Sequence, residues 1–321
     1  MILRTLKMLR FYGLFYALRY LANGFNLAFS RFFDIEFQKK KVLGFEMFLP
    51  TGDIGISQAL LLYGDRELQL KYILDKEIKP GYTIIDLGAN LGYYPLIEYQ
   101  KLNGSGKIYA LEPSPSNFKT LEKNILHNKA NNLIDTFQYA GGEKAGKEKF
   151  YLSTHSNVNT MIPKEFSTGK DSLGVGDKYI EVEVIELSSF IKDKGQIDLI
   201  RMDIEGYEVE VFRGLKNAIE SSLFSGQIVF ECHSPKYDDK EHSIREQLKM
   251  LFDNGYYAKY MTSNREKNST FHPRGYKPIK TIRTSVDNIQ GVYENVSNED
   301  AEYLICDGLG VRDVFFEKRM R

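Results

Sequence analysis

Apolar residues between Tyr82 and Met261 form short continuous runs that alternate with stripes at helical spacing. A continuous apolar run favours a buried strand, whereas a stripe that repeats every three or four positions favours an amphipathic helix. The predicted strands are Tyr82–Leu87, Lys107–Leu111, Leu133–Tyr139, Ile197–Met202, Gln227–Glu231 and Tyr256–Met261. The predicted helices are Gly92–Leu102, Ser116–Lys129, Tyr207–Ile219 and Ile244–Phe252. Strands that alternate with helices predict an α/β fold whose mostly parallel sheet is covered on both faces.

The segments on either side of this alternation have weaker patterns. We expect residues 1–75 to form a helical N-terminal extension, with a short hairpin near Val42–Leu49. Residues 76–321 would then form one α/β domain with variable insertions near residues 141–178 and 262–300. After the second insertion, Glu302–Cys306 and Asp313–Phe316 are predicted to supply closing strands.

The segment from Met1 to Phe33 combines a helical apolar stripe with positive charge. Its basic residues are Arg4, Lys7, Arg10, Arg19 and Arg31, and it contains no acidic residue. These charges interrupt the apolar residues too often for a transmembrane helix. A basic amphipathic helix lies either on an anionic membrane surface or against protein. We expect a cytoplasmic protein in which this segment packs on the domain, with a peripheral membrane contact or a homodimer contact as alternatives.

Composition narrows the function classes. The chain has 43 basic and 43 acidic residues, and this balance argues against a general nucleic-acid binder, which usually carries a basic excess. Its cysteines, Cys232 and Cys306, are too few for a disulfide framework or a zinc site. The most informative positions are therefore those that follow the strands, because ligands of parallel sheets bind beyond the carboxyl ends of the strands.

The first predicted strand leads into the turn Asp86-Leu87-Gly88-Ala89-Asn90-Leu91-Gly92. Its glycines allow a sharp turn and a close approach of the backbone to a ligand, and the next helix points its N-terminus at the same space. Asn90 stands where the dinucleotide fingerprint G-x-G-x-x-G has its second glycine, which disfavours a pyrophosphate cofactor. The acid at the start of the turn suits a cofactor with a cationic amino acid portion.

Acidic residues also follow three of the other strands. Glu112, after the second strand, can accept hydrogen bonds from both hydroxyls of a ribose, and the alternative is a solvated loop acid. The fourth strand ends in Asp203-Ile204-Glu205-Gly206-Tyr207-Glu208, where a helix N-terminus explains Glu205 and Glu208 better than Asp203. The fifth ends in Glu231-Cys232-His233, where a histidine is either structural or functional.

Taken together, these segments resemble the FkbM family of methyltransferases. The segments that carry the resemblance are Ile85–Tyr94, Ala110–Asn117 and Ile197–Glu208, in the order and spacing of the family, and Ile228–His233 is similar to its next strand. The likeness covers about residues 60–260. Pro95 and Arg201 depart from it, because the family often has a small hydroxyl residue and a lysine there.

The resemblance implies a Rossmann-like class I methyltransferase fold with a seven-stranded sheet, S-adenosylmethionine as cofactor, and methyl transfer to oxygen. Family substrates are often sugars, glycans or natural products. The cofactor contacts would come from Asp86, Gly88, Ala89, Asn90, Gly92, Glu112, Pro113 and Asn117. Such an enzyme must align the reactants and remove the hydroxyl proton. The base candidates are His233, then Asp203 and Glu205, with His155 as a weaker one.

Three other interpretations remain open. Asp203, Glu205, Glu231 and His233 offer ligands for Mg²⁺, but clustered acids at strand ends need no metal, so a metal is the less favoured version. A nicotinamide-dependent oxidoreductase would share the fold but lacks its glycine fingerprint here. A non-catalytic Rossmann-like scaffold that binds partners through its N-terminal helix is the third.

Overall fold

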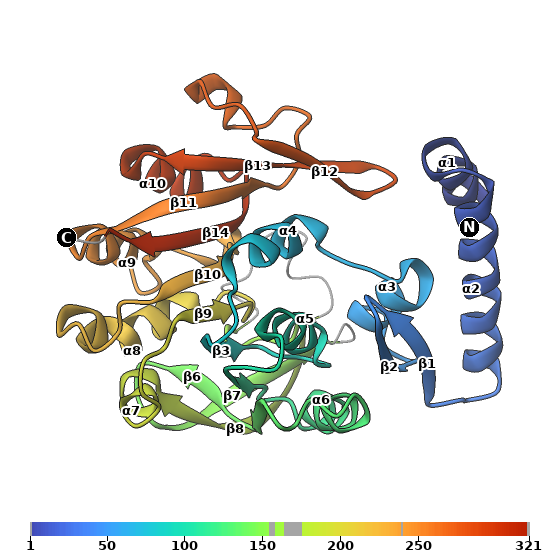
Figure 1. Ribbon diagram of the computed structural model, residues 1–321, viewed down its shortest axis with the longest axis horizontal. Coiled ribbons are helices and arrows are strands. Elements are labelled where there is room, and N and C mark those ends of the chain that lie inside the picture. The colour runs from blue at the N-terminus through green and yellow to red at the C-terminus, as the bar shows by residue number, and fades with distance from the viewer. Residues whose placement is uncertain (1, 154–157, 164–174, 239, 320–321) are drawn as a thin grey trace.

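The computed structural model describes residues 2–153, 158–163, 175–238 and 240–319 (Figure 1). Within these ranges the main sheet has nine strands in the order β12-β13-β11-β14-β10-β9-β3-β4-β5. In chain order they are β3 (Thr83–Leu87), β4 (Lys107–Leu111), β5 (Ile134–Phe137), β9 (Leu199–Met202), β10 (Gln227–Glu231), β11 (Tyr256–Ser263), β12 (Lys280–Ser285), β13 (Asn288–Val296) and β14 (Val311–Lys318).

The central strands confirm the predicted α/β class. Strands β5, β4, β3, β9 and β10 are parallel to one another, and β14 is antiparallel to both β10 and β11. These strands with β11 make the expected seven-stranded sheet. The hairpin β12–β13 adds two antiparallel strands at one edge, and it lies in the segment 262–300 that the sequence left as an insertion.

Alternate residues of the central strands face two separate hydrophobic cores, because successive side chains of a strand point to opposite faces. Ile84 lies in one core and Ile85 in the other, and Leu199 and Ile200 divide in the same way. One core includes residues of α8 (Glu208–Glu220), α9 (Ile244–Asp253), α10 (Asn298–Cys306) and α7 (Leu187–Lys192). The other includes residues of α3 (Ile56–Tyr63), α4 (Leu68–Glu77), α5 (Tyr93–Leu102) and α6 (Pro115–His127). Helices therefore cover both faces of the sheet, as predicted.

A second, smaller sheet occupies the insertion near residues 141–178. It consists of β6 (Ala140–Gly142), β7 (Gly146–Ser153) and β8 (Val175–Glu186) in the order β6-β8-β7. Its apolar residues Phe150, Val182 and Val184 join the core that contains α8. Ala140, Gly141 and Phe150 of this sheet line the same cavity as the residues that follow β3 and β4.

The N-terminal segment folds into two helices and a hairpin. Helix α1 (Ile2–Tyr12) and helix α2 (Leu14–Phe32) are separated at Gly13, whose φ of 87° breaks the single stripe of the sequence. Strands β1 (Phe37–Val42) and β2 (Phe45–Pro50) form the predicted hairpin, which is longer than expected. Figure 1 shows α1 and α2 at the edge of the molecule, beside β1, β2 and α3. Among the described residues, no helix is long and apolar enough to cross a membrane.

One predicted strand is wrong. Residues 302–306 belong to helix α10, and β14 alone closes the sheet. The helix begins after Ser297, whose hydroxyl accepts from the Asp300 amide, and Glu299 and Asp300 lie in its first turn. A serine cap and acids at the N-terminus both stabilise a helix, and they outweigh the short apolar run that suggested a strand.

Candidate active site

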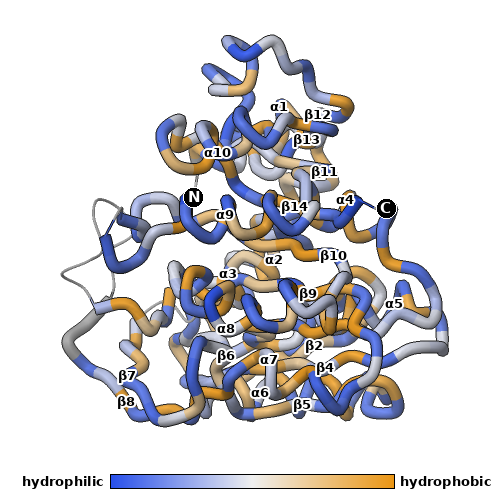
Figure 2. Tube along the Cα trace, turned by 90° about the vertical axis from the view of Figure 1, so that its left-hand side faces the viewer, coloured by the Kyte–Doolittle hydropathy of each residue, from blue (hydrophilic) through white to orange (hydrophobic). Residues whose placement is uncertain are grey.

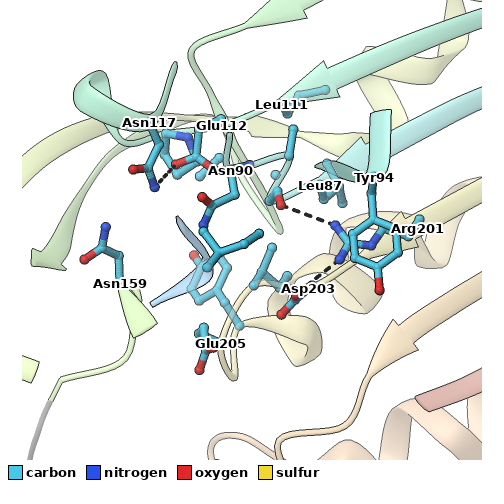
Figure 3. A pocket seen from close by; sticks show the side chains of 18 of the residues that line it. Leu87, Asn90, Tyr94, Leu111, Glu112, Asn117, Asn159, Arg201, Asp203 and Glu205 are labelled. Atoms are coloured by element: carbon cyan, nitrogen blue, oxygen red, sulfur yellow. Dashed lines mark hydrogen bonds and ion pairs between the residues drawn. The ribbon is translucent and has the colours of Figure 1, made fainter. Parts of the chain in front are cut away.

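A cavity of about 800 Å³, part of it open to solvent, lies beyond the carboxyl ends of β3, β4 and β9 (Figure 3). The sequence-predicted residues that line it are Gly88, Ala89, Asn90, Glu112, Pro113, Asn117, Asp203 and Glu205. These residues come from segments that are far apart in the chain and meet because parallel strands end at the same edge. His155, the weaker base candidate, lies outside the described residues.

The turn after β3 is built around close backbone contacts. Gly88 has a φ of 80°, and a Cβ on it would lie 2.1 Å from the carbonyl oxygen of Asp203. Its amide and that of Ala89 both donate to the Leu111 carbonyl, at 2.9 and 3.0 Å. Only glycine allows this approach, so the turn after β3 is locked to the ends of both neighbouring strands, β4 and β9.

Asp86 and Gly92 do not line the cavity, so the structure does not support direct cofactor contacts from them. Asp86 is fully buried, and its Oδ1 accepts from Nη1 of Arg201 at 2.9 Å. Gly92 has a φ of 90°, and a Cβ there would meet Leu121 of α6 at 3.1 Å. Both residues support the turn without lining the cavity: Asp86 does so through its ion pair, and Gly92 through helix packing.

Arg201, the departure from the family's lysine, lines the cavity between two carboxylates. Its Nη2 lies 3.1 Å from Oδ2 of Asp203, while its Nη1 donates to Asp86 and to the Gly88 carbonyl. Its guanidinium carbon lies 3.9 Å from the ring centroid of Tyr94, a cation–π contact that Figure 3 shows face on. Arg201, which lines the cavity, therefore connects β3, β9 and α5 through these contacts.

Glu112 has the environment of a ligand-binding carboxylate. Its Oε2 accepts from the Asn90 amide at 2.9 Å, and its Oε1 accepts from the Ser114 amide at 2.9 Å. Burial raises its pKa to about 7, although the amides of Ser114 and Asn90 oppose this shift. Oε1 also accepts from Nδ2 of Asn117 at 3.5 Å, so the oxygen with one protein donor and a remaining lone pair is Oε2.

Asp203 lies at the bottom of the cavity among several other acids. Burial, followed by the charge of Glu231, raises its pKa to about 8, and Arg201 only partly offsets this. Burial and the neighbouring acids therefore favour the protonated form of Asp203 in the ligand-free protein. A positive charge placed beside it would favour the ionised form.

Glu205 has a strained backbone and a fixed side chain. Its φ of 53° lies in the left-handed region, which is costly for a residue other than glycine and often marks a functional position. Lys236, which is almost fully buried, donates to its Oε2 at 2.8 Å. Burial disfavours its charged form, but His233 and Lys236 together lower the pKa of Glu205 to about 2. A permanently ionised carboxylate therefore faces the cavity.

His233 lies behind this carboxylate and is not among the residues that line the cavity. Its Nδ1 lies 2.9 Å from Oε1 of Glu208, whose other oxygen accepts from the Tyr237 hydroxyl at 2.9 Å. Its Nε2 faces Glu205 at 3.5 Å and Asp203 at 4.0 Å. Burial opposes a charge on the ring, yet Glu205 and Glu208 raise the pKa of His233 well above its ordinary value. A protonated imidazole cannot accept a proton, so this geometry favours a positioning role over the predicted role of base.

The possible metal ligands also form a cluster. Ligand atoms of Asp203, Glu231 and His233 lie within 4.8 Å of one another. However, Arg312 donates to Glu231 at 2.7 Å, and Arg201 occupies Asp203. The two carboxyl groups therefore each have a guanidinium neighbour within ion-pair distance in addition to forming a possible metal-ligand cluster.

Several cavity residues come from the N-terminal extension and were missed by sequence reasoning. Arg66 and Glu67, between α3 and α4, line the cavity opposite the strand ends. Tyr94 donates from its hydroxyl to Glu67 at 2.8 Å, and Tyr93 donates to the Arg66 carbonyl at 2.6 Å. The two tyrosines directly follow the glycine turn. This pair of adjacent aromatic residues was the one signal in the sequence that another segment of the chain packs over the turn.

Comparison with known proteins identifies the family. The model of the methyltransferase FkbM domain matches residues 86–258, more than half of the chain. The chain belongs to the FkbM family of methyltransferases. The matched range contains the glycine turn, Glu112, Asp203 and His233, but not Arg66, Glu67 or the N-terminal helices.

Individual relatives are distant. The chain is similar to 31-O-demethyl-FK506 methyltransferase FkbM of Streptomyces tacrolimicus, with 24% identity over 56% of this chain and 74% of that protein. It is 28% identical to methyltransferase sdnD of Sordaria araneosa, over 53% of this chain and 71% of that protein. It is 25% identical to hexuronic acid methyltransferase AglP of Haloferax volcanii, over 50% of this chain and 60% of that protein.

Among solved structures, the chain aligns with methyltransferase FkbM from Methylobacillus flagellatus KT. The TM-score is 0.39 and the identity 15%, over 66% of this chain and 43% of that chain. The aligned part is therefore less than half of that protein.

Proposed function

We propose that this protein is an S-adenosylmethionine-dependent O-methyltransferase that acts on a hydroxyl group of a sugar, a glycan or a small natural product. One observation carries the proposal. A buried carboxylate that can accept from a diol, Glu112, shares one cavity with the two acids that follow the neighbouring strand β9, Asp203 and Glu205.

The residues fit the ribose and the cation of this cofactor. Oε2 of Glu112 accepts one protein hydrogen bond and keeps a lone pair, and the carboxylate lines the cavity where the adjacent hydroxyls of a ribose could reach it. Burial and the neighbouring acids favour the protonated form of Asp203, and the ligand-free cavity has an excess of carboxyl groups. A sulfonium and an ammonium group would balance that excess, whereas a pyrophosphate would be repelled by it.

When bound, S-adenosylmethionine supplies an electrophilic methyl group. The protein must then exclude water, orient the acceptor hydroxyl and take its proton. Asp203 is the best base in this cavity, because its pKa of about 8 is far closer to neutrality than that of Glu205, about 2. Glu205 and His233 position the site by placing charges of opposite sign beside Asp203.

The names of the relatives support transfer to oxygen on polyhydroxylated molecules. One relative is a 31-O-demethyl-FK506 methyltransferase, and another is a hexuronic acid methyltransferase.

Methyl transfer can be tested directly with S-adenosylmethionine labelled in the methyl group. The purified protein would be incubated with separate pools of methyl glycosides, hexuronic acid glycosides and polyketide alcohols, and the products analysed by mass spectrometry. We expect a labelled O-methyl ether with at least one pool, formed about 10²–10⁴ times more slowly by Asp203→Asn. A labelled product that carries the methyl group on carbon, or no labelled product from any pool, would contradict the proposed function.

A further inference from the structure

A second cavity adjoins the first at Arg66 and Glu67, which line both. It contains about 1320 Å³ of space, part of it open to solvent, between the N-terminal helices and the β12–β13 hairpin. Resting on the proposed function, we propose that this second cavity is the acceptor site, and that it binds a sugar bearing an anionic group.

Unsatisfied buried polar atoms point to a hydroxyl-rich ligand. Gln69 is fully buried, and its amide nitrogen donates to Asp313 at 3.1 Å. Among the described residues, its Oε1 has no hydrogen-bond partner, and neither has Oδ1 of Asn288, another residue of this cavity. A buried acceptor without a donor costs stability, so a ligand with hydroxyl groups would satisfy both.

Aromatic rings supply the apolar part of a sugar site. Tyr12, Tyr16 and Tyr63 line the cavity from α1, α2 and α3. Tyrosine presents a flat apolar face with a polar tip, which suits the mixed apolar and polar faces of a pyranose ring. The cavity thus offers both surfaces that a sugar requires.

The charges of the cavity favour an anion. Four arginines line it, Arg19, Arg66, Arg283 and Arg312, against the two acids Asp65 and Glu67. Arg66 and Arg312 are occupied by Glu67. Within the described ranges, no carboxylate oxygen lies within 4.0 Å of Arg19 or Arg283. Arg19 instead donates to the Tyr63 carbonyl, and Arg283 lies over the Phe11 ring. Both guanidinium groups therefore keep N–H donors and a charge without an ion-pair partner, which suits a carboxylate or a phosphate.

Binding of simple sugars to the full-length protein tests this assignment. The probes are methyl glucoside, methyl glucuronide and glucose 1-phosphate, measured by calorimetry and saturation-transfer NMR. We expect both anionic probes to bind more tightly than methyl glucoside, and the tighter one identifies carboxylate or phosphate as the natural group. In Arg283→Gln, binding of the anionic probes should weaken by about tenfold or more.

The matched control is Lys280→Gln, which removes an exposed charge from the same strand, β12, outside the cavity. S-Adenosylmethionine affinity should be unchanged in both variants. Failure of wild type to bind that cofactor would sink the proposed function, whatever the sugars do. If the cofactor binds but methyl glucoside binds as tightly as the anionic probes, or Arg283→Gln binds them like wild type, the acceptor assignment is wrong.

A different observation concerns the outer face of α1 and α2, which is apolar and faces away from the protein. One side of α2 packs inward through Ala17, Tyr20 and Leu27. The opposite side exposes large apolar residues, with Phe15 and Phe25 each 72% and Phe32 80% exposed. The other members of this outer face are Leu3, Leu6, Leu14, Leu18, Phe29 and Phe33. A patch of this extent marks an interaction surface.

We propose that the outer face docks on an anionic lipid bilayer. The segment from Met1 to Phe33 has five basic residues and no acidic one. Lys7, Arg19 and Arg31 have partners on the protein, whereas Arg4 and Arg10 are exposed on α1 beside the outer face and can attract anionic lipid. A symmetric dimer through the same face would bring these positive segments together, which disfavours a second copy as the occupant. Long basic side chains can reach past an apolar face to lipid head groups.

Vesicle flotation of the full-length protein tests this docking surface. We expect binding to vesicles that contain phosphatidylglycerol, little binding to pure phosphatidylcholine, and release at high salt. The double variant Phe15→Glu/Phe25→Glu should lose about tenfold or more of this binding. The control Leu126→Glu changes an apolar residue on α6 that is 61% exposed, and it should bind like wild type.

Thermal unfolding and cofactor affinity establish that the double variant is folded. Light scattering of the wild type and the double variant tests whether a second copy of the chain, and not a bilayer, covers the outer face. A wild-type dimer that becomes monomeric in the double variant, without vesicle binding by wild type, would overturn the bilayer proposal in favour of a second copy. Equal flotation of wild type and the double variant would also overturn it.

Discussion

Nη1 of Arg201 lies 2.9 Å from Oδ1 of Asp86, beneath the turn that lines the candidate active site. The two side chains come from the adjacent parallel strands β9 and β3, and both are almost fully buried. A buried charge that loses its partner is strongly destabilising, so this pair should control the stability of the site floor.

We expect Arg201→Met to lower the free energy of unfolding by about 3–5 kcal/mol, because Asp86 and Asp203 would lose their guanidinium partner. Urea denaturation provides the measurement. Adding Asp86→Asn should recover part of the loss, since it removes the unpaired charge. The exposed pair of Arg245 and Glu302 is the control, and Arg245→Met should cost at most about 1 kcal/mol. Equal costs for the two arginines would contradict this account.

Glu112→Gln should weaken S-adenosylmethionine binding by about tenfold or more while leaving the fold intact. The variant keeps the shape of the side chain but replaces a charged acceptor with a neutral one that turns a donor toward the ribose. Calorimetric titration measures the change. The control is Glu122→Gln on α6, an exposed position where affinity should not change. If Glu112→Gln bound S-adenosylmethionine as tightly as wild type, Glu112 would have no role in ribose binding.

The rate of methyl transfer should depend on the ionisation of Asp203. The active form needs the ionised carboxylate, so kcat/KM should rise with pH and level off above about 8, the pKa of this group in the free protein. Asp203→Asn should abolish this inflection and lower the rate by about 10²–10⁴. His233→Gln should move the inflection to higher pH, because it removes a positive charge 4.0 Å from Asp203. A pH profile in His233→Gln identical to wild type would refute the positioning role.

The same raised pKa affects stability with a definite sign. The folded protein holds a proton on Asp203 that the unfolded chain releases above its ordinary value of 3.8. This group therefore contributes stability that is present at low pH and lost as the pH rises toward about 8. Asp203→Asn should keep that contribution, so the difference in unfolding free energy between variant and wild type should grow from pH 5 to pH 9. A constant difference would show that Asp203 ionises normally.

Removal of metal ions should leave the activity unchanged. The candidate ligands Asp203 and Glu231 are already paired with Arg201 and Arg312, and His233 lies among charged partners. We expect full activity after treatment with a chelator and less than about a twofold effect of added Mg²⁺. Complete loss in chelator, restored by a divalent cation, would assign a metal to this cluster.

The sequence predicted those parts of the site that follow strands. Glu112, Asp203 and Glu205 could be placed in one cavity, because the strand order of an α/β sheet brings the carboxyl ends of its strands together. Arg66 and Glu67 could not, since they arrive through tertiary packing of the N-terminal extension, held by two tyrosine hydroxyls. His233 was expected to act as the base, but only the structure shows the carboxylates that raise its pKa and places it outside the residues that line the cavity.

Calorimetric titration with S-adenosylmethionine and with NAD tests the central claim most directly. The account predicts saturable binding of S-adenosylmethionine at one site per chain and no measurable binding of NAD, because Asn90 interrupts the dinucleotide fingerprint and acids surround the cavity. Tight binding of NAD without binding of S-adenosylmethionine would contradict it.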